Sequence, residues 1–222
     1  MDIYNEISAA LQKGRDKLAV ELVGKALEQS LSAQEILDQG LMRGMDVVGD
    51  KFKNNKMFLP EVMMAAKAMS KGTEVLKPFL ASGGPSGLGK AAIGTVKGDR
   101  HDIGKNLVKM MIEGKGIETI DLGVDVSAEK FVGACKDKGV RIICCSALLT
   151  TTMKEMKRVV ELFEKEGLRS QVAIFVGGAP VTEGFRESIG ADYYAADAAS
   201  AAEMVREVAL KHRAESQLES QI

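Results

Sequence analysis

The change of sequence pattern near residue 91 constrains the fold of this chain more than any other feature. Before it the chain is rich in helical periodicity, and after it short apolar runs alternate with helical stretches. The pairs are AAIGTV then 102–115, ETIDLG then 127–138, RIICCSAL then 151–166, VAIFVGG then 181–189, and DYYAAD then 198–212. Strands and helices that alternate at this length predict an open, five-stranded parallel sheet with helices on both faces.

Residues 1–81 have the pattern of a helical bundle. Apolar residues recur three and four positions apart through 18–27 and 36–48, which is the spacing of one buried helix face. Ser32 followed by Glu35 resembles a capping box, and Pro60 fits the first turn of a last helix. We therefore expect four helices in this part of the chain.

The segment SGGPSGLGK at 82–90 is typical of a linker between two domains. The expected organisation is a helical cap at 1–81, a linker at 82–90, an α/β domain at 91–213 and a polar tail at 214–222. The fold class is thus α/β, with an N-terminal four-helix bundle preceding the parallel sheet.

Composition excludes several classes of protein. The 222 residues have a formal net charge of −1, so no overall basic field exists to attract nucleic acid. No apolar run reaches the roughly 18 residues of a membrane span, and the N-terminus lacks the pattern of a signal peptide. A soluble, cytoplasmic protein is expected. Cys135, Cys144 and Cys145 do not form a disulfide framework, and we expect them to be core residues.

The candidate chemistry lies in three loops at the carboxyl ends of predicted strands. In an open parallel sheet, ligands bind at that edge. The loop 97–104 contains GDRHDIG, in which Asp99, His101 and Gly104 form the pattern D-x-H-x-x-G. The loop 146–152 is rich in hydroxyl side chains, and the loop 177–180 reads GGAP. A histidine with a carboxylate two residues before it is suited to holding one metal ion from one side.

Each loop also has a purely structural interpretation. His101 could be a hydrogen-bonded structural histidine, the hydroxyl residues of 146–152 could cap the next helix, and Gly177–Gly178 could form a tight turn. The methionines between 42 and 69 could belong to the bundle core. Three unusual loops on one predicted edge nevertheless favour a single shared ligand.

The chain resembles the corrinoid proteins of methyltransferase systems and is similar to the cobalamin-binding module of methionine synthase. The residues that carry the resemblance are VVGDKFKNNKMFLPEVMMAAKAM, TVKGDRHDIGKNLV, DLGVDV, SALLTTTM and GGAP, which together span nearly the whole chain. The resemblance implies a Rossmann-like, flavodoxin-like cobalamin-binding domain preceded by the helical domain of methionine-synthase type.

The resemblance also implies a base-off corrinoid, with its nucleotide tail in a slot of the α/β domain and His101 as the lower cobalt ligand. Asp99 would accept the other ring N–H, and Thr152 occupies the position of a serine that extends this pair in methionine synthase. Phe52 and Leu59 match residues that shield the methyl group, and Gly104 leaves room for the tail. The implied catalytic residues are His101, Asp99 and Thr152, and the implied cofactor-binding residues are Gly98, Asp99, Arg100, His101, Asp102, Ile103, Gly104, Ser146, Leu148, Thr150, Gly177, Gly178, Ala198, Phe52, Leu59 and Met63.

The implied function is that of a methyl carrier, a subunit without a substrate site of its own. Cobalt would receive a methyl group at a substrate-specific methyltransferase and deliver it at a second methyltransferase, and a reductive activase is a further expected partner. Two alternatives stay open at this point, a cobalamin-dependent regulator and the small subunit of an adenosylcobalamin mutase. The methyl donor stays open among methanol, methylamines, quaternary amines and methyl thiols, because it binds to the partner.

Overall fold

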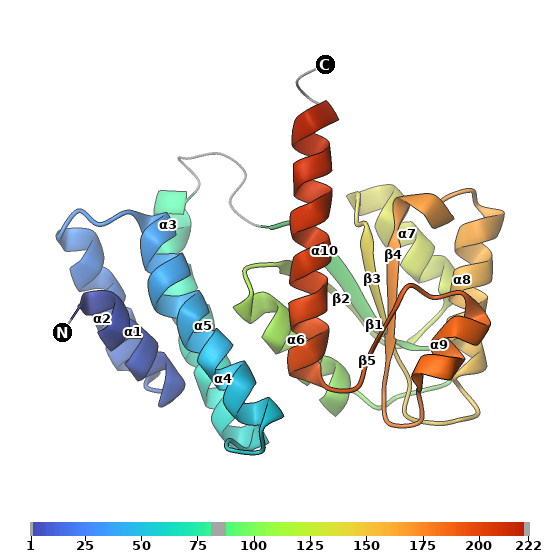
Figure 1. Cartoon of the computed structure of the whole chain (residues 1–222), viewed down its shortest axis with the longest axis horizontal. Helices are drawn as coiled ribbons and strands as arrows, with labels where there is room; N and C mark the ends of the chain where they lie inside the picture. Colours follow the sequence, from blue (N-terminus) through green and yellow to red (C-terminus); the bar gives the residue numbers. More distant parts are fainter. Residues whose placement is uncertain (1, 81–87, 220–222) are drawn as a thin grey trace. The chain divides into compact units, whose positions relative to one another are not determined.

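The computed structural model describes residues 2–80 and 88–219, and the side chains as far as residue 215. The chain divides into two compact units, Met1–Gly87 with Gly114–Gly116 and Leu88–Glu113 with Ile117–Ile222. Figure 1 identifies the elements of both units along the chain. The predicted linker at 82–90 lies outside the described residues up to 87, and its last residue, Lys90, already belongs to the first strand.

The N-terminal unit is helical. Its elements are α1 (Ile3–Gln12), α2 (Asp16–Glu28), α3 (Ala33–Glu35), η1 (Ile36–Met42), α4 (Arg43–Lys53) and α5 (Leu59–Leu80). Because α3, η1 and α4 follow one another without interruption, they form one long helix, and residues 2–80 contain the four helices expected. The hydroxyl of Ser32 accepts a hydrogen bond from the Glu35 N–H at 3.4 Å, and Pro60 lies in the first turn of α5.

The segment η1 is a π-helix, which the apolar spacing did not predict. A π turn places residues five apart above one another, and Ile36 and Leu41 are both fully buried at that spacing. Gly40 lies against α1, where a Cβ atom would approach Cγ2 of Ile7 to 3.0 Å. The wider turn therefore coincides with close packing between this long helix and α1.

The C-terminal unit is a doubly wound α/β domain. Its parallel sheet has the order β2-β1-β3-β4-β5, in which the chain reverses direction of winding between β1 and β3. The strands are β1 (Lys90–Val96), β2 (Glu118–Val126), β3 (Ile142–Ser146), β4 (Ala173–Gly177) and β5 (Tyr193–Ala195). The helices are α6 (Ile103–Gly114), α7 (Ala128–Lys138), α8 (Lys154–Lys165), η3 (Arg169–Gln171), α9 (Glu183–Ile189) and α10 (Ala198–Glu219). The predicted fold class is confirmed.

Helices cover both faces of this sheet. Figure 1 shows α6 and α10 on one face, with α7, α8 and α9 on the other. Phe131, Met156 and Phe163 from the second group pack against Ile143 and Ile174 in one buried cluster. Helix α10 continues to Glu219, beyond the predicted helix at 198–212, because the polar residues that follow are mostly good helix formers.

Candidate functional site

The turn after β1 carries the D-x-H-x-x-G motif to the carboxyl edge of the sheet. The Asp99 N–H donates to the Val96 carbonyl at 3.1 Å, which closes a tight turn with Gly98 as its third residue. Gly98 has φ +80°, as a type II turn requires at that position. Helix α6 then begins at Ile103, so His101 lies between the strand and the helix.

Asp99 is fully buried and lies at the centre of a hydrogen-bond network. Its Oδ1 accepts from the His101 backbone N–H at 3.1 Å and from the His101 ring nitrogen Nδ1 at 2.7 Å. Its Oδ2 accepts from the backbone N–H groups of Leu148 and Leu149 at 2.8 and 3.2 Å, and from the Thr152 hydroxyl at 2.8 Å. One carboxylate therefore joins the loop after β1 to the loop after β3.

The surroundings of Asp99 favour its charged form. Burial alone would raise the pKa of this carboxyl, but the hydrogen bonds from Leu148, His101 and Thr152 outweigh it and hold the pKa well below its usual range. An ionised Asp99 can only accept hydrogen bonds, so the proton between the two side chains belongs to Nδ1 of His101.

This arrangement leaves the other ring nitrogen of His101 as the lone-pair donor. The His101 side chain is 52% exposed, while the Asp99 side chain beneath it is fully buried. The His101 backbone is also held, because its carbonyl accepts from the Thr95 hydroxyl at 2.8 Å. A neutral imidazole fixed through Nδ1 and open at Nε2 is the arrangement that protein metal ligands adopt.

Replacing Thr152 with valine tests how much this network stabilises the fold. The Thr152 hydroxyl lies 2.8 Å from both Asp99 Oδ2 and the Leu149 carbonyl, and the residue is buried. Removing it should lower the free energy of unfolding of the cofactor-free protein by about 1–2 kcal/mol in urea titration. Thr152→Ser keeps the hydroxyl and should lose less than Thr152→Val. Equal losses would contradict a contribution from this hydrogen bond.

Asp99→Asn should reveal the low pKa of Asp99 as a pH-dependent loss of stability. The folded protein lowers this pKa, so ionised Asp99 stabilises the fold above the ordinary value near 4. That contribution disappears as pH falls through the lowered value. At pH 7 the substitution should cost about 2–3 kcal/mol, since it removes a charged acceptor. Urea titrations of both proteins should give a smaller difference below pH 4, and a difference that grows on acidification would contradict this assignment.

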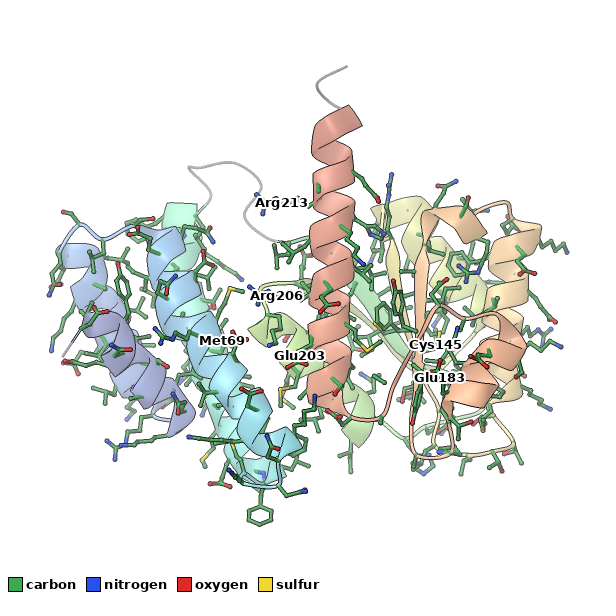
Figure 2. The ribbon with its side chains drawn as sticks, viewed as in Figure 1. Met69, Cys145, Glu183, Glu203, Arg206 and Arg213 are labelled. Carbon is green, nitrogen blue, oxygen red and sulfur yellow. The ribbon has the colours of Figure 1, made fainter. Side chains whose placement is uncertain are left out.

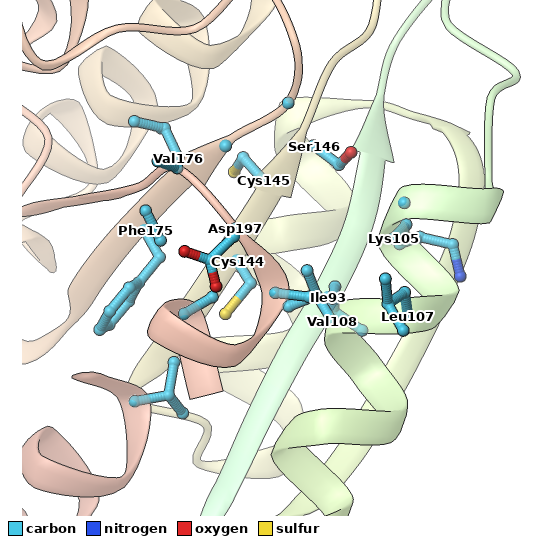
Figure 3. A pocket seen from close by; sticks show the side chains of 18 of the residues that line it. Ile93, Lys105, Leu107, Val108, Cys144, Cys145, Ser146, Phe175, Val176 and Asp197 are labelled. Carbon is cyan, nitrogen blue, oxygen red and sulfur yellow. The ribbon is translucent and has the colours of Figure 1, made fainter. Parts of the chain in front are cut away.

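A cavity of about 320 Å³ opens in the same α/β unit, between the sheet and the helices α6 and α10. The lining residues labelled in Figure 3 include Ile93, Cys144 and Phe175 from the strands, Val108 from α6, and Asp197 after β5. Most of the labelled lining side chains are apolar. The cavity can therefore accept a largely apolar group of moderate size.

Five of the predicted cofactor-binding residues line this cavity: Gly104, Ser146, Gly177, Gly178 and Ala198. A Cβ atom on Gly104 would meet nothing within 4 Å, so its missing side chain leaves open space. Gly178 has φ +128°, and a Cβ atom there would lie 1.9 Å from the Ala147 carbonyl oxygen. The backbone therefore requires glycine at 178, whereas at 104 the structure itself has room for a side chain.

The other predicted residues of the α/β unit lie around the motif and do not line the cavity. Ile103 is 71% exposed and Leu148 is 44% exposed, and Val124 and Leu149 are further exposed apolar side chains. Gly98, Arg100, Asp102 and Thr150 are exposed as well.

The predicted residues of the helical unit lie at the junction of α4 and α5. Phe52 and Leu59 are half-buried, and Met63 is 51% exposed. Of the methionines between 42 and 69, the buried ones are Met42, Met45, Met57 and Met69, which supports the core interpretation for these four. Met64 is exposed beside Met63, and Phe58 is the most exposed large apolar residue of the described chain.

The sequence interpretation missed part of the cavity wall. Cys144 was expected only in the core. It is buried, but it also lines the cavity, and Phe175 and Asp197 are further lining residues that were not predicted. Figure 2 places Cys145 among the strands, where it is buried too. Burial raises the pKa of the Cys144 thiol to about 12, so this thiol stays uncharged at neutral pH. Cys144 and Phe175 lie in the middle of β3 and β4, where no sequence signal marks a cavity wall, and only Asp197 follows the end of its strand, β5.

Comparison with known proteins relates this geometry to a family. Residues 89–206 match a sequence profile described as a B12 binding domain, and residues 3–77 match a second profile with the same description. The chain belongs to the B12-binding corrinoid proteins. The two matches cover both structural units, and the cofactor is a cobalamin or a related corrinoid.

Individual corrinoid proteins are similar over nearly the full length. A corrinoid protein of Desulfitobacterium hafniense (strain Y51) is 39% identical over 211 residues, covering 94% of this chain and 98% of that protein. Dimethylamine corrinoid protein 3 of Methanosarcina acetivorans is 40% identical over 208 residues, covering 94% and 97%. Among solved structures, the methanol:cobalamin methyltransferase complex of Methanosarcina barkeri matches with a TM-score of 0.83 and 31% identity, over 94% of this chain and 80% of the matched chain.

The cavity and the exposed imidazole fit a corrinoid. Gly104, Ser146, Gly177 and Gly178 keep bulky side chains out of the opening, and the cavity is large enough for the base of a nucleotide tail. Over the described ranges 2–80 and 88–219, no helix is long and apolar enough to span a bilayer. Within those same ranges, no three His, Cys, Asp or Glu side chains gather as a protein-only metal site.

Proposed function

We propose that this corrinoid protein is a methyl carrier that binds its cofactor base-off, with His101 as the lower axial ligand. The observation that carries the proposal is the 2.7 Å contact between Nδ1 of His101 and the buried Asp99 carboxylate. It fixes the imidazole as the Nδ1–H tautomer and leaves Nε2 available on the exposed side. When bound, the cofactor supplies a cobalt that accepts and releases methyl groups.

The cavity is the proposed site of the nucleotide tail. It is lined by the three glycines Gly104, Gly177 and Gly178 together with the hydroxyl residue Ser146. A base-off cofactor needs such a site, because its lower base has left the metal and must be buried elsewhere. Ser146 would donate a hydrogen bond inside the cavity, and its apolar walls would exclude water from the base.

The exposed apolar residues near the motif are the proposed contact surface for the corrin ring. Ile103, Leu148 and Leu149 expose large side chains around the loops that hold Asp99 and His101. Among the described residues, few leucine or isoleucine side chains are exposed, so the occurrence of several near one site favours an apolar ligand over water. The backbone N–H groups of Leu148 and Leu149 also donate hydrogen bonds to Asp99, which couples this contact surface to the axial imidazole.

Phe52, Leu59 and Met63 are the proposed apolar shield of the opposite, methyl-bearing face. Supporting this proposal, the start of α5 exposes Phe58 and Met64 besides Met63, although a bundle core would bury such residues. Long, unbranched methionine side chains adapt to a surface that must open and close repeatedly.

Methyl transfer by the loaded protein tests the proposal. The protein is loaded with methylcobalamin and mixed with a thiol acceptor and each candidate methyltransferase, and methylated thiol is measured against free methylcobalamin. We expect a faster transfer from the loaded protein, because a carrier presents its methyl group to a partner enzyme. A substrate-specific methyltransferase and a reductive activase are the other proposed partners. Cofactor-dependent DNA binding, or a radical signal without methyl transfer, would overturn the proposal in favour of a regulator or a mutase subunit.

A further inference from the structure

We infer that Asp125, at the end of β2, is a positioning residue for the His101 imidazole. Neither its position in the edge strand nor the exposure of its side chain suggests such a role. The inference rests on two hydrogen bonds that join this residue to the turn before His101, and it builds on the proposed axial ligation.

The two hydrogen bonds form a clamp on the turn after β1. Oδ1 of Asp125 accepts from the Gly98 N–H at 2.7 Å. The Asp125 N–H donates to the Asp99 carbonyl at 2.9 Å. The side chain and the backbone of one residue thus hold two consecutive residues of a turn that lies 27 positions earlier in the chain. A helix cap or a local loop contact would bond to near neighbours instead.

The local backbone of β2 is distorted to make this clamp. Asp125 has φ +55°, a left-handed conformation that few residues other than glycine adopt. The pairing of β1 with β2 shifts between Gly94 and Val96, where Gly94 pairs with Gly123 and Val96 with Val126. Two residues, Val124 and Asp125, stand opposite only Thr95. Such a bulge redirects a side chain next to a site, and strained backbone of this kind persists where the surroundings hold it.

The clamp acts on the imidazole through Asp99. The carboxylate of Asp99 is bonded to His101 and to the loop after β3, but its backbone is held on the β2 side by Asp125. If the clamp is released, the turn can rotate about Gly98, which has a freely adjustable backbone. The 2.7 Å contact to Nδ1 then becomes longer or intermittent, and the direction of Nε2 is less defined.

Three substitutions separate the side-chain bond from the backbone conformation. Asp125→Gly keeps the positive φ and loses the acceptor. Asp125→Asn keeps an acceptor oxygen and tolerates the left-handed conformation, so it is the conservative control. Asp125→Ala loses the acceptor and adds strain. Corrinoid affinity should fall about 10-fold in Asp125→Gly, as for other residues that orient a metal ligand, and stay near wild type in Asp125→Asn.

The cofactor-free protein offers a readout that does not depend on methyl transfer. The chain has only two histidines, His101 and His212, so two-bond 1H–15N NMR spectra resolve both rings, and His101→Ala assigns them. We expect His101 of the wild type and of Asp125→Asn to be the Nδ1–H tautomer. In Asp125→Gly we expect a mixture of both tautomers, with His212 unchanged.

Wild-type hydrogen exchange gives a second test that no folding defect can obscure. The Gly98 amide should exchange more slowly than a free amide, because its bond to Asp125 protects it. An unprotected Gly98 amide, or Asp125→Gly with wild-type affinity and wild-type tautomer, would overturn the role of Asp125. If His101→Ala also left the spectrum of the bound corrinoid unchanged, the proposed axial ligation itself would fail. The two failures are therefore distinguishable.

Discussion

Gly104→Leu should reduce the affinity for complete cobalamin by at least 100-fold while the protein still folds. Gly104 is in the first turn of α6 and lines the cavity, and a Cβ atom there would meet no other atom within 4 Å. A leucine side chain is therefore expected to project into the open space without a clash, and glycine is the weaker helix former by about 1 kcal/mol. The loss of affinity would come from lost space for the tail.

Cobinamide, a corrinoid without the nucleotide tail, provides the matched control. Gly104→Leu should bind cobinamide as the wild type does, because only the tail needs the cavity. Gly104→Ala adds a single methyl group and should have an intermediate affinity for cobalamin. Equilibrium dialysis measures all six combinations. An equal loss for cobalamin and cobinamide would contradict the assignment of the cavity to the tail.

His101→Ala should weaken cobalamin binding by about 100-fold or more, since substitutions of residues that merely orient a ligand already cost 10–100-fold. The imidazole is half exposed, so its removal should change the free energy of unfolding of the cofactor-free protein little. The visible spectrum of any bound cofactor should become that of a corrinoid without a lower nitrogen ligand. His212→Ala, on α10, is the control and should keep wild-type affinity and spectrum.

The alternation of pattern after residue 91 was sufficient to predict the sheet, because parallel strands and their crossover helices differ in both period and length. The order of the strands could not be predicted in the same way. It depends on the handedness of the crossovers and on where along the chain the winding direction reverses, and the point of reversal is set by tertiary packing. The π turn at Ile36–Met42 was not predicted, since a single wide turn changes the apolar spacing by one residue.

Contacts within the short motif of the candidate site could be predicted from the sequence pattern alone, whereas contacts between distant loops could not. The Asp99–His101 contact could be expected because both residues belong to one short motif, and their 2.7 Å hydrogen bond is present. The bond from Thr152 to Asp99 depended on how two loops meet, and the structure brings them together at 2.8 Å. Asp125 belongs to the segment DLGVDV, but no role was predicted for it. Its two hydrogen bonds to the turn depend on a positive φ, which the sequence pattern does not reveal. Long-range geometry, more than residue type, was the missing information.

The central claim is that His101 supplies the lower nitrogen ligand of cobalt, and electron paramagnetic resonance tests it most directly. Protein labelled only with 15N-histidine is loaded with unlabelled cobalamin and reduced to the Co(II) state. A coordinating 14N nucleus splits each cobalt line into a triplet, whereas 15N splits it into a doublet. We predict doublets in the labelled wild type and in labelled His212→Ala. Triplets in the labelled protein would mean that the cofactor keeps its own base on the metal, and would contradict the account.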